Sequence, residues 1–268
     1  MKKGTGAREI SSIIGRIPNR MALAGGWIDQ PFMSRLNPSP PGSMVVVGLQ
    51  PTFRVMDRSG MATSTRKVAV ELWPDGLPDR DAAQLVRELY WAENRDKTEP
   101  SGSQDMIGLI YPGINRLDYD YAHEGGVFPL HIESCNDGQI ARWLERVIKL
   151  IPIVQRPEVY DPLGRKTLDP RWVQRLGQSG KDCYGAIVES NAEALGASMN
   201  QCMLAWEKLL PNVVRHPVVD LLEILHFYQS RYAGAMYSGC GGGYLYVVSE
   251  ESVPGAISVS LRIDERRH

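Results

Sequence analysis

Two acidic side chains follow small or glycine-rich segments, a combination that can orient an alcohol and accept its proton. Asp29 comes after a Gly-Gly-Trp-Ile turn, and Asp105 comes after the sequence SGSQ at 101–104, directly before an apolar run. A carboxylate that faces a cleft can take the proton of a substrate hydroxyl. Each aspartate is also typical of a turn or a helix cap, and Arg20 with Asp29 is also compatible with an ordinary surface ion pair.

Two further segments suit the binding of an anion or a sugar. The sequence SGCGGG at 238–243 precedes an apolar strand, and glycine lets backbone N–H groups approach a ligand closely. The sequence GMATST at 60–65 precedes KVAVELW, and at a helix start it would offer N–H donors and a positive dipole end to a phosphate. For 238–243 the alternative is a tight turn that leads into the strand, but the number of glycines favours a functional loop. For the second segment, the alternation at 67–72 allows a strand in place of the helix.

Hydrophobic periodicity and turn residues predict the elements that position these segments. The first half predicts strands at 21–24, 43–49, 106–111 and 115–119, and a helix at 81–94. The second half predicts strands at 130–134, 244–248 and 257–263, and helices over 137–148, 192–210 and 217–232. This order predicts an α+β fold with a boundary near 125–135, and therefore domains at 1–130 and 131–268.

Composition excludes several classes of protein. The chain has 268 residues with 30 Lys and Arg against 31 Asp and Glu, so its formal net charge of −1 argues against a nucleic-acid partner. No apolar run approaches the roughly 18 residues of a membrane span, so no membrane partner is expected. The four cysteines form no C-x-x-C pair, which favours a reducing compartment and a cytoplasmic location.

In this order, the segments resemble the GHMP kinases, and most closely their sugar branch. The sequence IPNRMALAGGWIDQPF is similar to the first motif of that branch, and GMATST is similar to the second. SGSQDMIGLIYPGINRLDY is similar to its G-x-Q-D-Q segment, and YSGCGGGYLYVV to the third motif. The resemblance covers residues 15–35 and 58–250, and it implies a two-domain GHMP kinase-like fold with a C-terminal ferredoxin-like domain.

The resemblance also implies an activity, namely phosphorylation of a hydroxyl on a sugar or sugar phosphate with ATP and Mg²⁺. It implies that Asp105 is the catalytic base and that Arg20 stabilises developing charge. The substrate-binding residues it implies are Gly26, Trp27, Asp29, Gly239, Gly241 and Gly242. The nucleotide-binding residues it implies are Gly60, Ala62, Thr63, Ser64 and Thr65. The Mg²⁺ ligands it implies are Glu93 and Ser64.

Two alternatives stay open. About thirty residues separate Asp29 from Gly60, where the family carries a longer segment that helps to hold adenine. This short segment allows a catalytically inactive GHMP-like protein that binds a small molecule or a partner through a reduced nucleotide site. The other alternative is a kinase for a non-sugar alcohol, as in the homoserine and mevalonate branches.

Overall fold

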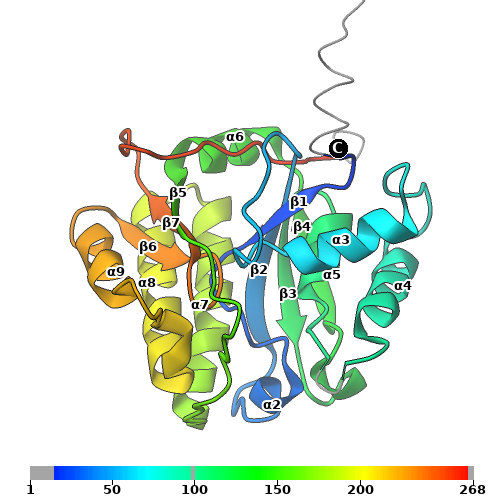
Figure 1. Cartoon of the computed structure of the whole chain (residues 1–268), viewed down its shortest axis with the longest axis horizontal. Helices are drawn as coiled ribbons and strands as arrows, with labels where there is room; N and C mark the ends of the chain where they lie inside the picture. The colour runs from blue at the N-terminus through cyan, green and yellow to red at the C-terminus, as the bar shows by residue number, and fades with distance from the viewer. Residues whose placement is uncertain (1–14, 98–99, 265–268) are drawn as a thin grey trace, which may run out of the picture.

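The computed structural model describes residues 15–97 and 100–264, which form two antiparallel sheets and the helices that cover them (Figure 1). One sheet has the strand order β1-β2-β3-β4 and the other β5-β7-β6. The strands are β1 (Asn19–Ala22), β2 (Gly42–Leu49), β3 (Ile114–Tyr119), β4 (His131–Cys135), β5 (Ile148–Val154), β6 (Gly234–Tyr237) and β7 (Gly243–Val248). The α-helices are α2 (Pro31–Ser34), α3 (Thr63–Leu72), α4 (Ala82–Asn94), α5 (Gln104–Ile110), α6 (Gly138–Val147), α7 (Pro170–Val188), α8 (Ala192–Leu209) and α9 (Leu221–Gln229).

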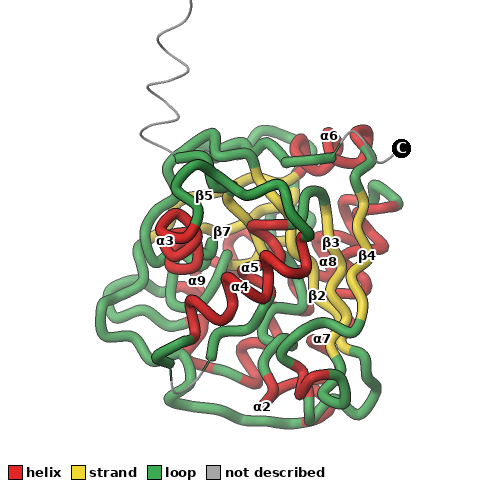
Figure 2. Tube along the Cα trace, turned by 90° about the vertical axis from the view of Figure 1, so that its right-hand side faces the viewer, coloured by secondary structure: helices red, strands yellow, loops and turns green. Residues whose placement is uncertain are grey.

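Strand β2 lies at the centre of the first sheet and is buried along its whole length. Its run MVVV is apolar on both faces because helices cover both of them. On one face α5 packs against β1 and β2, and α3, α4 and α5 lie together on the side that faces the viewer in Figure 2. On the other face lies α7, where Gly177 and Gly180 bring the helix against the β2 backbone.

Helix α8 joins the two sheets. It packs along α7 on one side and against β6 and β7 on the other, while α9 covers β6. Its inner residues Leu195, Met199, Cys202 and Trp206 are buried, as the helical spacing predicts. The result is a mixed α/β fold in which one helical hairpin holds the two sheets together.

Most predicted elements are confirmed, but the segment that carries Asp105 is a helix and not a strand. Residues 104–110 form α5, and the Ile107 N–H donates to the Ser103 carbonyl at 3.0 Å. All residues from Met106 to Ile110 are buried. The prediction was wrong because a short, fully buried apolar run has the same pattern in a helix as in a strand. The same ambiguity at 67–72 resolves to a helix, α3.

Three further differences concern the second half. Helix α9 begins at Leu221 rather than at Pro217, because the Asp220 carboxylate accepts hydrogen bonds from the Leu222 and Glu223 N–H groups. Residues 257–263 form only isolated bridges to Leu49 and Leu150. Ile148 begins β5 instead of ending α6.

Helix α7, strands β5 and β6 and the short helix α2 were not predicted. The start of α7 did carry a signal, since the Asp169 carboxylate caps the helix and Pro170 occupies its first turn. Strand β4, directly after residue 130, pairs with β3 and completes the first sheet. The division into domains at residue 130 stays a prediction. Among the described residues, no helix is both long and apolar enough to cross a membrane.

Candidate active site

A cavity of about 550 Å³ brings together segments that are far apart in the sequence. Strand β1, the turn before α2, the loop before α3, the start of α5 and the turn between β6 and β7 all contribute to its wall. Predicted site residues in the wall are Arg20, Gly26, Trp27, Asp29, Gly60, Ala62, Thr63, Ser64, Asp105 and Gly239. The acceptor-side and phosphate-side predictions therefore meet in one cavity.

Asp105 lies in the first turn of α5, and two side chains hold its carboxylate. One oxygen forms an ion pair with the Arg20 guanidinium, and the other accepts a hydrogen bond of 3.3 Å from Thr65 Oγ1. Arg20 is buried in β1 and also donates to the Gly60 carbonyl at 3.1 Å. The Asp105 side chain keeps 19% of its surface exposed, so it is fixed in place but open to the cavity.

Asp29 is buried beside Asp105. Burial, and to a smaller extent the Asp105 charge, raise the pKa of Asp29 to about 7, although its own N–H, the Arg20 charge and the Trp27 N–H act in the opposite direction. Gly102 leaves the room that this carboxyl occupies, because a Cβ at position 102 would overlap Asp29 Oδ2. At neutral pH Asp29 is therefore divided between an acceptor-only carboxylate and a carboxylic acid that can also donate.

The loop before α3 has the backbone of an anion-binding turn. Gly60 has a φ of +77° and Ala62 a φ of +56°, and helix α3 begins immediately afterwards. Ala62 is the N-cap residue and has no side chain that could accept from the N–H groups of the first turn. Arg58, Lys67 and Arg156 also line the cavity, so cations surround this helix start. Such a start attracts phosphate oxygens.

The glycines of the β6–β7 turn have different roles. Gly239 lines the cavity and crosses the phosphate-side loop so closely that a Cβ on Gly60 would lie 2.5 Å from Gly239 Cα. Gly241 packs against the Tyr160 ring and Gly242 against the Val154 carbonyl. The glycine run therefore lets two loops pass close to each other. Of the three glycines of this turn that are predicted to bind substrate, only Gly239 lines the cavity.

Trp27 and Trp206 form the wall beside the Gly-Gly turn. Trp27 lines the cavity with a φ of +82°, a left-handed conformation that is rare for a bulky residue. Trp206, expected from its spacing to lie in the core, is buried and also borders the cavity, where its indole N–H donates to the Gly26 carbonyl at 2.9 Å. Gly26 is needed there because a Cβ would lie 3.1 Å from the Trp206 ring.

Glu93, the predicted Mg²⁺ ligand, is buried near the end of α4. Lys97 Nζ forms an ion pair with Glu93 Oε1 at 2.9 Å. Glu93 Oε2 is buried and has no hydrogen-bond partner among the described residues. An unsatisfied carboxylate oxygen is chemically suited to a cation. Within residues 15–97 and 100–264, no three His, Cys, Asp or Glu side chains gather into a metal site.

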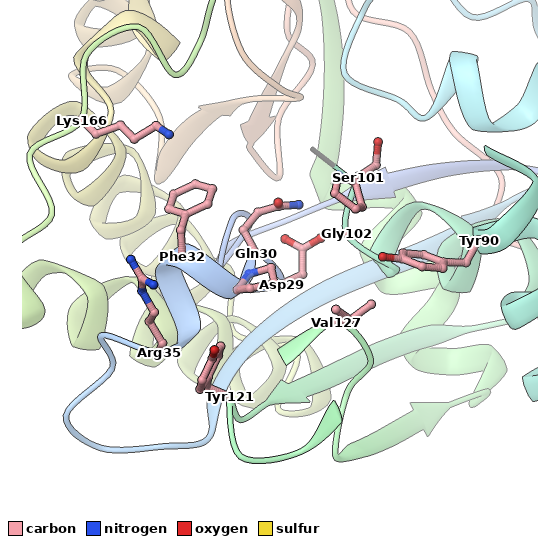
Figure 3. A pocket seen from close by; sticks show the side chains of 12 residues that line it. Asp29, Gln30, Phe32, Arg35, Tyr90, Ser101, Gly102, Tyr121, Val127 and Lys166 are labelled. Atoms are coloured by element: carbon pink, nitrogen blue, oxygen red, sulfur yellow. The ribbon is translucent and has the colours of Figure 1, made fainter. Parts of the chain in front are cut away.

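A second pocket of about 330 Å³ opens on the other side of Asp29 (Figure 3). It shares five wall residues with the first cavity, namely Asp29, Gln30, Pro100, Ser101 and Gly102. Phe32, Tyr90, Tyr121 and Val127 form its remaining walls, and Arg35 and Lys166 lie at one end. The sequence analysis missed this pocket because Arg35 and Lys166 belong to no motif and lie about 130 positions apart.

No protein-family model and no curated protein matches the sequence. Solved structures match it over most of its length. A mevalonate kinase aligns with 87% of this chain and 90% of its own at 12% identity and a TM-score of 0.59. A D-glycero-D-manno-heptose 1-phosphate kinase from Bacteriodes thetaiotaomicron aligns with 92% of this chain and 95% of its own, at 12% identity and a TM-score of 0.56.

The galactokinase of Lactococcus lactis, solved with galactose, aligns with 91% of this chain and 89% of its own. Its identity is 11% and its TM-score 0.57. Identities this low establish the architecture and leave the substrate open. The alignments cover 87–92% of this chain, and they confirm the fold that the motifs predict. The chain has the fold of the GHMP kinases.

Proposed function

We propose that the protein is a kinase that transfers the terminal phosphoryl group of ATP to a hydroxyl of a sugar or sugar phosphate. The observation that carries this proposal is the position of Asp105. Arg20 and Thr65 fix its carboxylate in the same cavity that contains the glycine loop and the start of α3. A fixed carboxylate beside a phosphate-binding turn is the arrangement that phosphoryl transfer to an alcohol requires.

On the phosphate side, the N–H groups at 63–65 would bind the phosphate oxygens of ATP. The side chains of Arg58, Lys67 and Arg156 line the same cavity and would balance their charge. Ser64 and Glu93 would hold Mg²⁺, which supplies charge neutralisation on the phosphate oxygens when it is bound. The buried oxygen of Glu93 that has no hydrogen-bond partner among the described residues supports this assignment, although Glu93, unlike Ser64, does not line the cavity.

On the acceptor side, Asp29 would orient the substrate and Asp105 would accept its proton. As the acceptor oxygen forms its bond to the terminal phosphorus, its proton moves to Asp105 and the bond from phosphorus to the departing ADP oxygen breaks. Arg20 contacts Asp105 and lies against the phosphate loop through Gly60, so its charge is near both reacting groups. Trp27 would pack against the carbon face of the acceptor.

The structural neighbours support the choice of acceptor class. By their names, the heptose 1-phosphate kinase, the galactokinase and a sugar kinase from Campylobacter jejuni act on sugars or sugar phosphates, while two others act on mevalonate. Two buried or partly buried carboxyl groups within one cavity suit an acceptor with several hydroxyls, since each can accept from one hydroxyl. This favours a polyol over an acceptor with a single hydroxyl.

The test is ADP release with a panel of sugars and sugar phosphates, comparing the wild type with Asp105→Asn. We expect the variant to lower kcat by at least about 100-fold, because a general base contributes that much, with the KM for ATP little changed. Equal turnover by both proteins would show that Asp105 is not the base. Calorimetry with Mg²⁺-ATP tests the inactive alternative, which requires that no nucleotide binds at millimolar concentration.

A further inference from the structure

The second pocket adjoins the cavity that contains Asp105. Both have the same five residues in their walls, from the turn 29–30 and the segment 100–102. Asp29 therefore borders both of them, and Figure 3 shows it in the wall of the second pocket. An acceptor whose reacting hydroxyl lies at Asp105 would have to pass the side of Asp29 to extend into the second pocket. Its volume of about 330 Å³ is at the lower end of small-molecule sites, so it would hold part of the acceptor.

Two cations lie at the far end of this pocket. In Figure 3, Arg35 and Lys166 lie on the same side of Asp29, with Phe32 between them and Tyr90 on the opposite side. Both side chains are exposed, and neither forms an ion pair with any residue that the structure describes. Lys166 Nζ rests 4.9 Å from the Phe32 ring centroid.

The charges of the pocket are therefore separated. Asp29 is the one acidic residue among those that line it, and the two cations occupy the other end. An anion would be repelled from Asp29 and attracted to Arg35 and Lys166. Between the two ends, Phe32, Tyr121 and Val127 offer apolar surface to a carbon chain or ring. Burial and the Asp29 charge raise the pKa of Tyr90, so its hydroxyl stays protonated and can donate a hydrogen bond.

We infer that the acceptor carries an anionic group, a phosphate or a carboxylate, which Arg35 and Lys166 bind at the far end of the second pocket. This inference rests on the proposed function, and it narrows the acceptor from any sugar to an anionic alcohol. It also gives the acceptor one orientation. A neutral sugar could enter the pocket in either direction, whereas an anionic end fixed away from Asp29 determines which hydroxyl reaches Asp105.

The experiment compares hexoses, hexose monophosphates and hydroxy carboxylic acids as acceptors, with ADP release as the readout. We expect the kcat/KM of an anionic acceptor to exceed that of the neutral hexoses by at least about tenfold. The variant Arg35→Gln/Lys166→Gln should raise the KM for that acceptor by about tenfold or more and leave kcat and the KM for ATP unchanged. The class of acceptor that the enzyme phosphorylates, hexose monophosphate or hydroxy acid, shows whether the bound anion is a phosphate or a carboxylate.

Arg215→Gln is the matched control, since it removes one exposed cation that lies outside the lining of both pockets. Preference for neutral hexoses, or no effect of the double variant, would overturn the inference and leave the kinase proposal intact. If no compound releases ADP, the proposed function fails, and calorimetry with the hexose monophosphates and the hydroxy carboxylic acids decides whether the second pocket binds an anion. Binding of either class by the wild type that the double variant loses supports the anion site, and no binding of either class by the wild type refutes it.

Discussion

Thr65 was predicted to reach the nucleotide or the metal, yet its hydroxyl donates to Asp105 Oδ2. Its side chain is buried and aligns the carboxylate from the side opposite Arg20. If Asp105 is the base, as proposed above, Thr65 positions it and acts on the acceptor through it rather than by contact.

We expect Thr65→Val to lower kcat by about three- to tenfold, the value of one hydrogen bond, with the KM for ATP unchanged. Valine keeps the shape of threonine and removes only the donor. Thr65→Ser should restore most of the activity, since it restores the hydroxyl. Steady-state kinetics checks both, and an unaltered kcat in the valine variant would contradict the assignment.

The protonation of the Asp29 carboxyl affects the free energy of unfolding of the protein. Its pKa is about 7 in the folded protein and near 4 in the unfolded chain, so the folded state binds more protons between these values. The contribution of Asp29 to stability therefore declines as the pH rises from about 4 to 7 and stays constant above that range.

We expect the wild type to lose stability relative to Asp29→Asn between pH 5 and pH 8, because asparagine never acquires the buried charge. Urea unfolding of both proteins at the two pH values measures the free energy of unfolding. Comparing the variant with the wild type cancels all other titrating groups. A difference that does not change with pH would show that Asp29 ionises normally.

At this scale, the motif residues could be predicted from the sequence and their partners could not. The turn and glycine patterns around Arg20, Asp29 and Asp105 made these residues predictable from the sequence. All three line one cavity, as expected. Gly102 is adjacent to Asp105 in the sequence but serves Asp29, and only the folded chain brings Asp29 against it. In the sequence, Arg35 and Lys166 look like ordinary surface cations. Only the folded structure shows that both line the same pocket.

At the scale of elements, α5 depends on a residue near the end of the described chain. The Arg262 guanidinium donates to the carbonyls of Leu109 and Ile110 at 3.1 and 2.7 Å, at the C-terminal end of the helix that carries Asp105. A cation satisfies these carbonyls and complements the helix dipole. Burial lowers the pKa of Arg262 to about 10, and the guanidinium stays charged at neutral pH.

We expect Arg262→Met to lower the free energy of unfolding by about 2 kcal/mol, because two buried carbonyls lose a charged donor. Activity should also fall, since the helix that positions Asp105 is no longer held at both ends. Urea unfolding and ADP release measure the two effects. Arg142→Met, at an exposed position on α6, is the control and should change neither.

Strand β6 and helix α7 were missed for different reasons. Strand β6 has only four residues, too few to show a period. In α7 the buried residues recur at helical spacing, from Val173 and Leu176 to Tyr184 and Ile187, so its pattern was present in the sequence but was overlooked. Helices α8 and α6 were predicted from patterns of the same kind.

At the scale of the whole molecule, the two sheets meet where backbone passes backbone. Gly60 belongs to the loop before α3 and Gly239 to the β6–β7 turn, and a Cβ on Gly239 would lie 2.6 Å from Gly60 Cα. Ser238 Oγ also donates to the Ser59 carbonyl beside this crossing. The phosphate-side loop therefore has its shape only when the second sheet is in place.

We expect Gly239→Ala to destabilise the protein by about 1–3 kcal/mol and to raise the KM for ATP, because the added methyl group pushes the loops apart. Gly185→Ala is the matched control. Gly185 lies within α7, and a Cβ at this position would have no neighbouring atom within 4 Å. Alanine should therefore raise the free energy of unfolding by about 0.5–1 kcal/mol. Thermal unfolding and nucleotide calorimetry distinguish the two variants, and equal behaviour would contradict a close crossing.

The bond between Arg262 and the end of α5 also sets an order for biosynthesis. A ribosome releases Asp105 and its helix more than 150 residues before it releases the arginine that fastens them. Nascent chains that stop short of residue 262 already contain all the cavity residues described above, but they lack this anchor. The C-terminal end of α5 would therefore gain its anchor only late in translation.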